Sequence, residues 1–276
     1  MGQLREDLRD TAIAAMALAD VRTVKQQPLA TNCRYCFDHA LERFAAIPVA
    51  GDRSLTVYSI SDNSVTLRQP KPDFDFWHVE LMFAKNDRFL MAFYFLRDGT
   101  EHLRVTDLQS GTVSISSTAS SESPGLSCAS HPNGRAIVFA ENPHELVVLD
   151  LPGGEVVRRI PLTHKSGPMC FDASGNVLAV SDLVTDEIVL FNFYSGEVVD
   201  RLAAPADQSG TPFAIAWSSD NHLLAVSRND GVILIWNVPT RQLVSGVRDR
   251  VRLVFAVCRN VKTSNRRILV TLGRVG

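Results

Sequence analysis

The sequence lacks the long apolar run that a membrane-spanning helix requires. No stretch of the 276 residues reaches about 18 consecutive apolar positions, so we expect no membrane segment. The first ten residues, MGQLREDLRD, mix charges of both signs and contain no hydrophobic signal core. The five cysteines are an odd number in a long chain, which argues against a disulfide framework. We therefore expect a protein of a reducing compartment, the cytoplasm.

The sequence also lacks the local signatures of common enzyme classes. It contains no HExxH metal motif, no GxSxG nucleophile elbow, no glycine-rich phosphate loop and no HRD or DFG motif. Its formal net charge of −2 excludes nucleic-acid binding by bulk positive charge alone. From these absences we expect a non-enzymatic chain without catalytic, cofactor-binding or metal-ligating residues, and no nucleic-acid partner.

What the sequence does contain is a turn, flanked by two short apolar strands, that recurs along the chain. Clear copies are CFDASGNVLAVS, AWSSDNHLLAVS, ASHPNGRAIVFA and MFAKNDRFLMAF. We take the last turn residue of each copy as a first mark, and successive first marks are 46, 47, 41, 46 and 44 residues apart. The first marks are Leu41, Asp87, Gly134, Gly175, Asn221 and Asn265.

A second mark recurs with the same period but out of phase. In segments such as IVLFNFYSGEVVDRL and VILIWNVPTRQLVSG, one strand ends, a turn follows and another strand begins. The second marks are Tyr58, Thr106, Leu149, Phe191 and Trp236. Two turns per unit predict four short antiparallel strands in about 40–45 residues, which is typical of a β-propeller blade.

The segment DGVILIWNVPTRQLVSG resembles a WD40 repeat, with Asn237 in place of the Asp that usually follows Trp. In WD40 blades a Trp, a Ser or Thr, an Asp and a His form a hydrogen-bonded structural network. The resemblance implies that Trp236, Asp230 and Ser227 belong to such a network. It extends over residues 33–273 and implies a propeller of WD40 type.

The histidine of that network is absent from its expected place before Trp217. His164 stands at nearly the right distance in the preceding unit, but the second mark of that unit is Phe191 rather than Trp. The resemblance therefore implies an incomplete network in both units.

The N-terminal region predicts a helix over residues 3–19, because Leu4, Leu8, Ala12, Ala15 and Ala19 fall on one stripe. Residues 21–26 predict a short strand. The segment LRDTAIAAMALADVR, followed by FDHALERFAAI, resembles the beginning of the propeller in bacterial proteins in which a serine/threonine kinase domain precedes a WD40 propeller.

These observations predict an all-β propeller of WD40 type with one N-terminal helix. We divide the chain into residues 1–28, the helix and short strand, and residues 29–276, the propeller. Six first marks but only five second marks predict five four-stranded blades plus a partial sixth, in an open or truncated ring. In such a ring residues 21–26 would pair poorly or pack against the exposed edge, because their partner strands are absent.

Two clusters invite a chemical interpretation. Cys33 and Cys36 form a CxxC with His39 close by, which could be half of a zinc site or a redox pair. Packing is the preferred interpretation, because all five cysteines lie in or near the first strand of a unit.

Asp73, Asp75 and Glu80 flank aromatic residues and could perform acid–base chemistry or bind a cation. We favour a linker between blades that is anchored by its aromatic side chains.

Three further features of the sequence are the histidines near the first turns, a serine-rich run and an uneven distribution of charge. His39, His131 and His222 occupy or adjoin the first turns, where we expect solvated side chains. The serine-rich run 116–123 resembles a flexible outer loop. Residues 141–200 contain ten acidic and three basic side chains, whereas residues 241–276 contain one acidic and nine basic ones.

The function that these patterns favour is a non-catalytic scaffold that binds a protein or peptide. One alternative is the regulatory or sensing propeller region of a bacterial serine/threonine kinase fusion. Another is a propeller enzyme or small-molecule binder that uses its central channel. A convergent set of charged or metal-binding residues would favour this last alternative, and the sequence offers none.

The second mark Trp236 generates a test of the repeat register. If Trp236 occupies the signature position of a blade, it is buried, and Trp236→Ala should cost about 3–5 kcal/mol of folding free energy. Urea or thermal unfolding measures this loss. Unchanged unfolding in the variant would show that the register is wrong.

Overall fold

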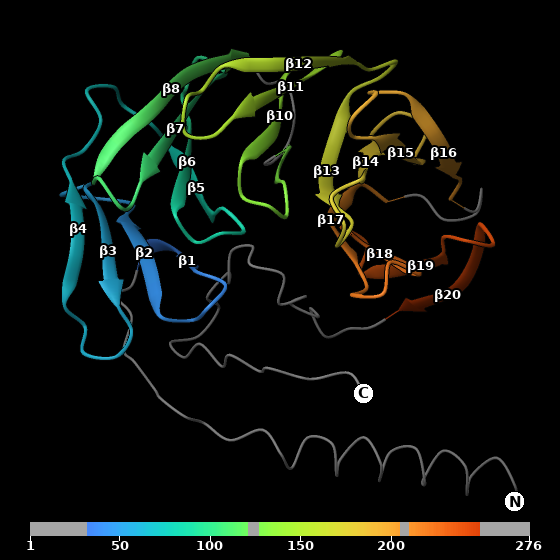
Figure 1. Ribbon diagram of the computed structural model, residues 1–276, viewed down its shortest axis with the longest axis horizontal. Coiled ribbons are helices and arrows are strands. Elements are labelled where there is room, and N and C mark those ends of the chain that lie inside the picture. Colours follow the sequence, from blue (N-terminus) through green and yellow to red (C-terminus); the bar gives the residue numbers. More distant parts are fainter. Residues whose placement is uncertain (1–31, 121–126, 205–209, 249–276) are drawn as a thin grey trace, which may run out of the picture. The chain divides into compact units, whose positions relative to one another are not determined.

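The computed structural model describes residues 32–120, 127–204 and 210–248 (Figure 1). In these ranges twenty strands form five antiparallel sheets of four strands, and the strands of each sheet pair in chain order. The described residues contain no helix long and apolar enough to cross a membrane. The five four-stranded units expected from the repeat are therefore confirmed.

Each sheet is named by its order in the chain. The first consists of β1 (Cys33–Phe37), β2 (Arg43–Pro48), β3 (Leu55–Ser59) and β4 (Val65–Gln69). The second consists of β5 (His78–Phe83), β6 (Phe89–Phe95), β7 (Thr100–Asp107) and β8 (Thr112–Ser120). The third consists of β9 (Cys128–Ser130), β10 (Ala136–Asn142), β11 (Glu145–Asp150) and β12 (Val156–Pro161). The fourth consists of β13 (Ser166–Phe171), β14 (Val177–Asp182), β15 (Ile188–Asn192) and β16 (Val198–Leu202). The fifth consists of β17 (Pro212–Trp217), β18 (Leu223–Arg228), β19 (Val232–Asn237) and β20 (Gln242–Arg248).

Several expectations fall outside the described ranges. They are the helix over residues 3–19, the strand over residues 21–26, the boundary after residue 28 and the partial sixth blade around Asn265. The serine-rich run 116–123 lies partly within the described ranges, and for that part the expectation of a flexible loop is wrong. Ser116 to Ser120 belong to β8, because β7 is long enough to pair with β8 from Asp107 as far as Thr100.

Apolar layers between neighbouring sheets make up the core. Four clusters of buried side chains separate the five sheets, one cluster for each pair of neighbours. Middle strands are covered on both faces, so they are apolar almost throughout; β6, with the sequence FLMAFYF, is buried at every position. This double burial explains why many strands show continuous apolar runs instead of strict alternation.

The five first marks that the structure describes lie in the turn between the first and second strands of their sheets. Their φ angles are positive, between 54° for Asp87 and 78° for Gly175, which is the left-handed region. The set comprises Leu41, Asp87, Gly134, Gly175 and Asn221. Glycine, asparagine and aspartate adopt this conformation most readily, which explains four of the five residues.

Two first marks carry a side chain that reaches back to the preceding sheet. The carboxylate of Asp87 accepts hydrogen bonds from the His39 amide at 2.8 Å and the Ala40 amide at 3.1 Å. The amide oxygen of Asn221 accepts a hydrogen bond from the Ala173 amide at 2.8 Å. Each bond joins the first turns of two neighbouring sheets.

Where the first mark is glycine, the bridging side chain comes from the preceding turn. Asn86 Nδ2 donates to Gly134 O at 3.1 Å, and His131 Nε2 donates to Gly175 O at 3.0 Å. A Cβ added to Gly134 would lie 2.2 Å from Asn86 Cγ, and one added to Gly175 would lie 2.4 Å from His131 Nε2. The first mark is therefore glycine where the preceding turn supplies the bridging side chain. It is Asp or Asn where the first mark supplies that side chain itself.

The second marks lie in the third strand of each sheet, and each adjoins a β-bulge. The fourth strand there contains one residue that the pairing skips. In the first two sheets the skipped residues, Thr66 and Ser114, donate a hydroxyl hydrogen bond to a third-strand carbonyl at 3.2 Å. In the other three sheets the skipped residue is an exposed valine: Val157, Val199 or Val244. Bulges bend the strand and strengthen its twist, so the second mark records where each blade bends.

The glycine at position 175 provides a test of the junctions between sheets. Gly175→Ala adds both a left-handed alanine and a collision with the His131 ring, whereas Gly99→Ala adds a left-handed alanine in open space. Gly99→Ala should cost about 1–2 kcal/mol, and Gly175→Ala about 1–3 kcal/mol more. Urea unfolding of both variants measures the difference. Equal losses would show that the junction is not tightly packed.

Candidate functional site

The segment that connects β4 to β5, residues 70–77, forms an ordered linker with the sequence PKPDFDFW. Its two phenylalanines pack against the buried Tyr94 ring, with centroid distances of 5.4 Å for Phe74 and 4.9 Å for Phe76. Phe76 belongs to the apolar layer between the first two sheets. The expected anchoring of this segment by aromatic side chains is what the structure contains.

Each Asp-Phe pair of the linker holds one arginine. The Arg104 guanidinium donates to Asp73 Oδ1 at 2.9 Å, and its Cζ lies 4.9 Å from the centre of the Phe74 ring. Arg53 likewise forms an ion pair with Asp75, and its Cζ lies 4.1 Å from the Phe76 ring centre. An arginine over an aromatic ring and beside a carboxylate is held at two points. The alternating Asp and Phe residues are visible in the sequence, but the arginines that they hold are far away in the chain.

With the linker held by these arginine contacts, Trp77 lies at the surface in a fixed orientation. Its side chain is 55% exposed. Its backbone amide donates to Phe95 O at 3.0 Å, and its indole Nε1 donates to Leu96 O at 3.2 Å. The ring also lies beside the rings of Phe95 and His78. A large aromatic surface is thus presented without free rotation of the side chain.

A polar cluster adjoins Trp77 and joins the first strands of two sheets. Arg34 of β1 donates to Nδ1 of His78 of β5 at 2.9 Å, so Nδ1 is the unprotonated nitrogen of that ring. The protonated Nε2 then faces Glu80 Oε1 at 3.4 Å. The sequence pattern pointed to Glu80 but to neither Arg34 nor His78 as a candidate site residue.

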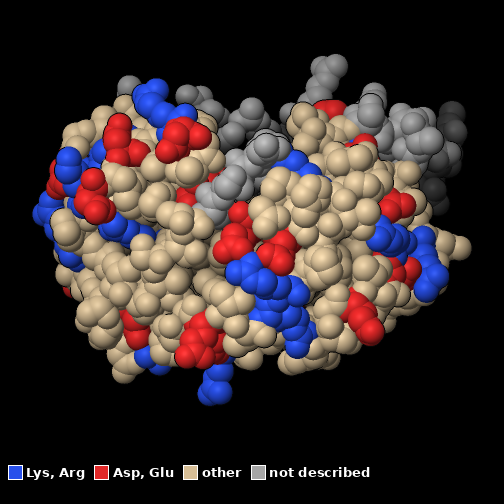
Figure 2. Space-filling model, turned by 90° about the horizontal axis from the view of Figure 1, so that it is seen from above, with Lys and Arg blue, Asp and Glu red and all other residues tan. Residues whose placement is uncertain are grey.

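The acidic residues of this region do not converge on one point. Asp73 and Asp75 are engaged by different arginines, and Glu80 pairs with a histidine. Within the three described ranges, no group of three or more His, Cys, Asp or Glu side chains could hold a metal ion. Elsewhere on the surface, basic and acidic side chains lie next to one another, as Figure 2 shows for one face.

Four cysteines occupy first strands, as their spacing from the first marks predicts. Cys33 and Cys36 lie in β1, Cys128 in β9 and Cys170 in β13, and the described residues contain no disulfide bond between them. Cys36 and Cys128 are buried, whereas Cys33 and Cys170 are half-buried. Cys258 lies outside the described residues.

The expectation of a solvated side chain is wrong for His131, which is only 3% exposed. Its Nδ1 accepts a hydrogen bond from the Asn133 amide at 3.2 Å, while Nε2 donates to Gly175 O in the next sheet. The rings of Phe171 and Phe193 cover it at 4.9 and 4.7 Å. The neighbouring sheet buries this turn residue, a tertiary contact that no local pattern records.

Trp236 lies in the third strand of the fifth sheet and is 2% exposed. Asp230 lies in the turn before β19, where its carboxylate accepts a hydrogen bond from the Val232 amide at 3.0 Å. Ser227 lies in β18 and pairs with Ile233. A hydrogen-bonded network of Trp236, Asp230 and Ser227 stays a prediction.

The fourth sheet contains a His–Asp pair at the end where the chain enters it from the third sheet. His164 Nδ1 donates to Asp182 Oδ2 at 2.8 Å, and the amides of Val184 and Thr185 donate to Asp182 Oδ1. Burial by itself raises the pKa of Asp182. The hydrogen bonds from His164 and the two amides outweigh burial, so the pKa of Asp182 lies below its ordinary value.

Comparisons with known proteins identify the fold. No protein-family model matches the chain, and no curated protein matches its sequence. Among solved structures, it is similar to the beta-propeller domain of Cps50 (Swd1) from Myceliophteria thermophila. The TM-score is 0.61 at 15% sequence identity, and the match covers 82% of this chain and 75% of that one. At this identity the likeness shows the fold alone: the five sheets are blades of a β-propeller.

The buried Tyr94 beneath the linker provides a pH test. Burial raises the pKa of its hydroxyl to about 12, against a lowering influence of Arg104. In the unfolded chain a tyrosine ionises near pH 10. Above that pH the unfolded state binds fewer protons than the folded state, so stability falls as the pH rises from about 10 to 12.

Tyr94→Phe should remove this part of the alkaline instability. Between pH 8 and 11, wild-type protein should lose about 1 kcal/mol more folding free energy than the variant, as urea unfolding at each pH measures. Tyr194→Phe, at an exposed site, is the control and should behave as wild type. Parallel pH profiles for wild type and Tyr94→Phe would contradict the burial of this hydroxyl.

Proposed function

We propose that this protein is a non-catalytic β-propeller scaffold that binds a protein or peptide through the surface around Trp77. The observation that carries the proposal is the fixed, exposed indole. Most of the energy of a protein interface comes from a few residues, among which Trp, Tyr and Arg are enriched. Fixing the side chain before binding removes part of the entropic cost of association.

The chemistry of the surrounding residues supports binding more than catalysis. The carboxylates of the linker are used to hold Arg53 and Arg104, and the polar cluster of Arg34, His78 and Glu80 joins two strands. None of these groups is left in the pairing of nucleophile and base that group transfer needs. Val184 and Phe213 add exposed apolar side chains at the linker ends of the fourth and fifth sheets.

We propose a cytoplasmic location, because an odd number of cysteines argues against a disulfide framework and favours a reducing compartment. Membership of the WD40 family and a place beside a kinase domain are expectations that rest on sequence resemblance. Neither is needed for the proposed binding role, which depends on the surface geometry alone.

Site-specific photo-crosslinking tests the proposal. A benzophenone amino acid at position 77 should capture a protein in cells, and the same group at position 194, which is exposed at the other end of a sheet, should not. The captured protein, once purified, should bind the wild-type chain at least tenfold more tightly than Trp77→Ala. Tyr194→Ala is the matched control and should bind as wild type. Equal binding by Trp77→Ala, with unchanged thermal unfolding, would exclude this surface.

A further inference from the structure

The polar cluster beside Trp77 contains an arginine whose hydrogen-bonding capacity is mostly unused. Arg34 is half-buried in β1, and a guanidinium group carries several N–H donors and no acceptor. Its Nη2 donates to His78 Nδ1 at 2.9 Å. Its Nε is buried and has no hydrogen-bond partner in the described protein. Such an unsatisfied donor is unusual in a folded protein and calls for an acceptor from elsewhere.

Arg34 also differs from the other arginines of this region because it forms no ion pair with a described residue. Arg53 and Arg104 are paired with the carboxylates of the linker. The nearby carboxylate of Glu80 faces Nε2 of the His78 ring at 3.4 Å, whereas Arg34 donates to Nδ1 of the same ring. The imidazole therefore stands between the two charges, and Glu80 does not supply the missing acceptor.

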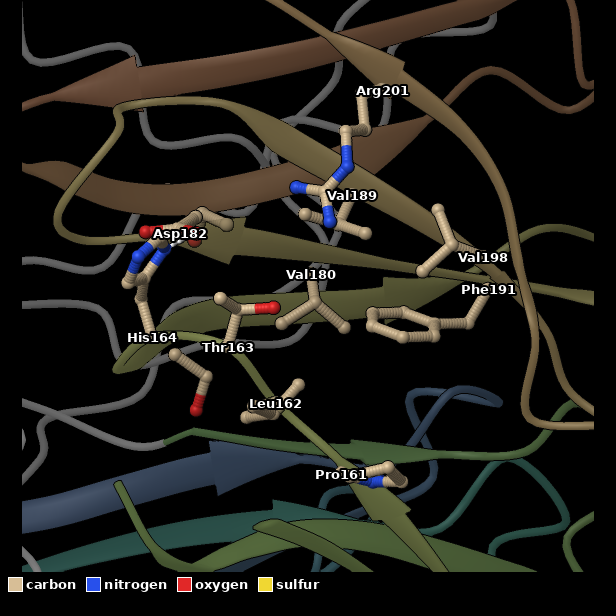
Figure 3. Close-up of a pocket in the computed structure, with 12 residues that line it drawn as sticks. Pro161, Leu162, Thr163, His164, Val180, Asp182, Val189, Phe191, Val198 and Arg201 are labelled. Atoms are coloured by element: carbon tan, nitrogen blue, oxygen red, sulfur yellow. Dashed lines mark hydrogen bonds and ion pairs between the residues drawn. The ribbon is translucent and has the colours of Figure 1, made fainter. Parts of the chain in front are cut away.

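A similar set of groups beside the fourth sheet is completely paired. A small pocket of about 40 Å³ opens there, and its lining includes Arg201, His164 and Asp182 (Figure 3). Arg201 is ion-paired with Glu187 at 3.2 Å, and His164 Nδ1 donates to Asp182 at 2.8 Å. Each of these basic side chains has a carboxylate of its own. The comparison singles out Arg34 as a base without such a partner.

Arg34 lies within reach of a ligand that covers Trp77. The ring centres of Trp77 and His78 are 5.4 Å apart, and Arg34 donates to that same His78 ring. Indole, imidazole and guanidinium thus follow one another in direct contact. In an extended segment, alternate side chains on one face are about 7 Å apart. One short segment can therefore place an apolar side chain on the indole and a second side chain at Arg34.

The missing group is best supplied by a carboxylate. Carboxylates bind guanidinium groups through two parallel hydrogen bonds, which are stronger than the bonds to a neutral carbonyl. A Lys or Arg side chain brings only further donors and cannot satisfy Arg34. The chemistry of the unused donors therefore selects an acidic residue.

Hydrogen bonding, more than net charge, determines this preference. Arg97 and Asp98 follow Leu96, whose carbonyl oxygen holds the indole. Asp98 accepts hydrogen bonds within its own turn, and Glu80 faces the imidazole. The two acidic side chains offset the charges of Arg97 and Arg34, so long-range attraction is weak. What the surface lacks is an acceptor beside Arg34.

We propose that the surface around Trp77 binds a partner-protein segment in which Asp or Glu lies within two positions of an apolar residue. The apolar side chain covers the indole, and the carboxylate accepts hydrogen bonds from Arg34. This inference rests on the proposed binding role of the surface and adds the chemistry of the partner. A segment without the carboxylate leaves the donors of Arg34 unsatisfied, which is the source of specificity.

Peptide titration of the full chain, followed by NMR of the indole N–H groups, tests the proposal. The probe is a blocked peptide, Gly-Glu-Ala-Leu-Ala-Glu-Gly, and the comparison peptides carry Gln, Lys or phosphoserine in place of both Glu residues. The Glu peptide should shift the indole resonance of Trp77 and leave that of Trp236, which is 2% exposed, unchanged.

The Gln and Lys peptides should bind at least about fivefold more weakly than the Glu peptide, because they bring no charged acceptor. Equal binding of the Gln peptide, or no binding of the Glu peptide at millimolar concentration, would overturn the proposal. Binding of the phosphoserine peptide about tenfold more tightly than the Glu peptide would assign the site to phosphate and would also overturn it.

Arg34→Met is the decisive variant, and Arg135→Met is its matched control. Arg135 is exposed in the first turn of the third sheet, and its loss changes the net charge equally. Arg34→Met should weaken binding of the Glu peptide at least about fivefold and leave binding of the Gln peptide unchanged. Arg135→Met should bind both peptides as wild type. An equal loss in both variants would show attraction by net charge alone and contradict the assigned contact.

Glu80→Gln keeps the test informative even if Arg34→Met fails to fold. The variant retains an oxygen that accepts from His78 and removes the negative charge nearest to Arg34. It should strengthen binding of the Glu peptide about twofold to threefold and leave the Gln peptide unaffected. Binding of the Glu peptide that is unchanged or weaker would count against a carboxylate at Arg34.

Trp77→Ala separates this inference from the proposed function. It should weaken the Glu and Gln peptides alike, because both place leucine on the indole. Loss of binding in Trp77→Ala but not in Arg34→Met would overturn the acidic preference and leave the binding surface standing. Binding of the Glu peptide that does not depend on Trp77 would reject both.

Discussion

The hydrogen bond between successive first turns is the constraint on which the arrangement of the sheets depends. A residue with left-handed backbone ends each turn, and one side chain spans the junction to the next turn. A glycine accepts the bridge where the preceding turn supplies it, as at Gly134 and Gly175. An Asp or Asn supplies it where the preceding turn offers backbone amides. This reciprocity gives every described junction between neighbouring first turns at least one hydrogen bond.

At the opposite end of the first two sheets, the linker of residues 70–77 holds the sheets together, as the hydrogen-bonded bridges do at the first turns. A connection without regular hydrogen bonding is ordinarily mobile. Here Arg53 and Arg104 each bind a carboxylate and cover a phenyl ring, and both rings rest on Tyr94. Order in the linker is what fixes Trp77. Binding capacity thus arises from side chains whose first role is packing, which suits a fold in which rigid sheets carry variable connections.

Differences between equivalent positions of the blades are where specificity can arise. The second marks range from Thr106 to Trp236, so equivalent positions carry side chains of very different size. The bulge residues change from hydroxyl side chains in the first two sheets to exposed valines in the other three. A repeat fold tolerates such changes because each blade contacts only its neighbours. The polar cluster beside Trp77 is one product of this local freedom.

The architecture of the described blades follows from the sequence pattern alone. Period, turn residues and apolar runs are local, and they located five first turns and a second turn in each unit, with strand order following from chain order. The β-bulges beside the second marks were not predicted. The burial of His131 and the arginine partners of Asp73 and Asp75 depend on the tertiary structure. Each depends on a residue of a neighbouring sheet or a distant strand, and a single sequence records no such pairing. The polarity of a turn residue does not reveal whether water or the next blade covers it.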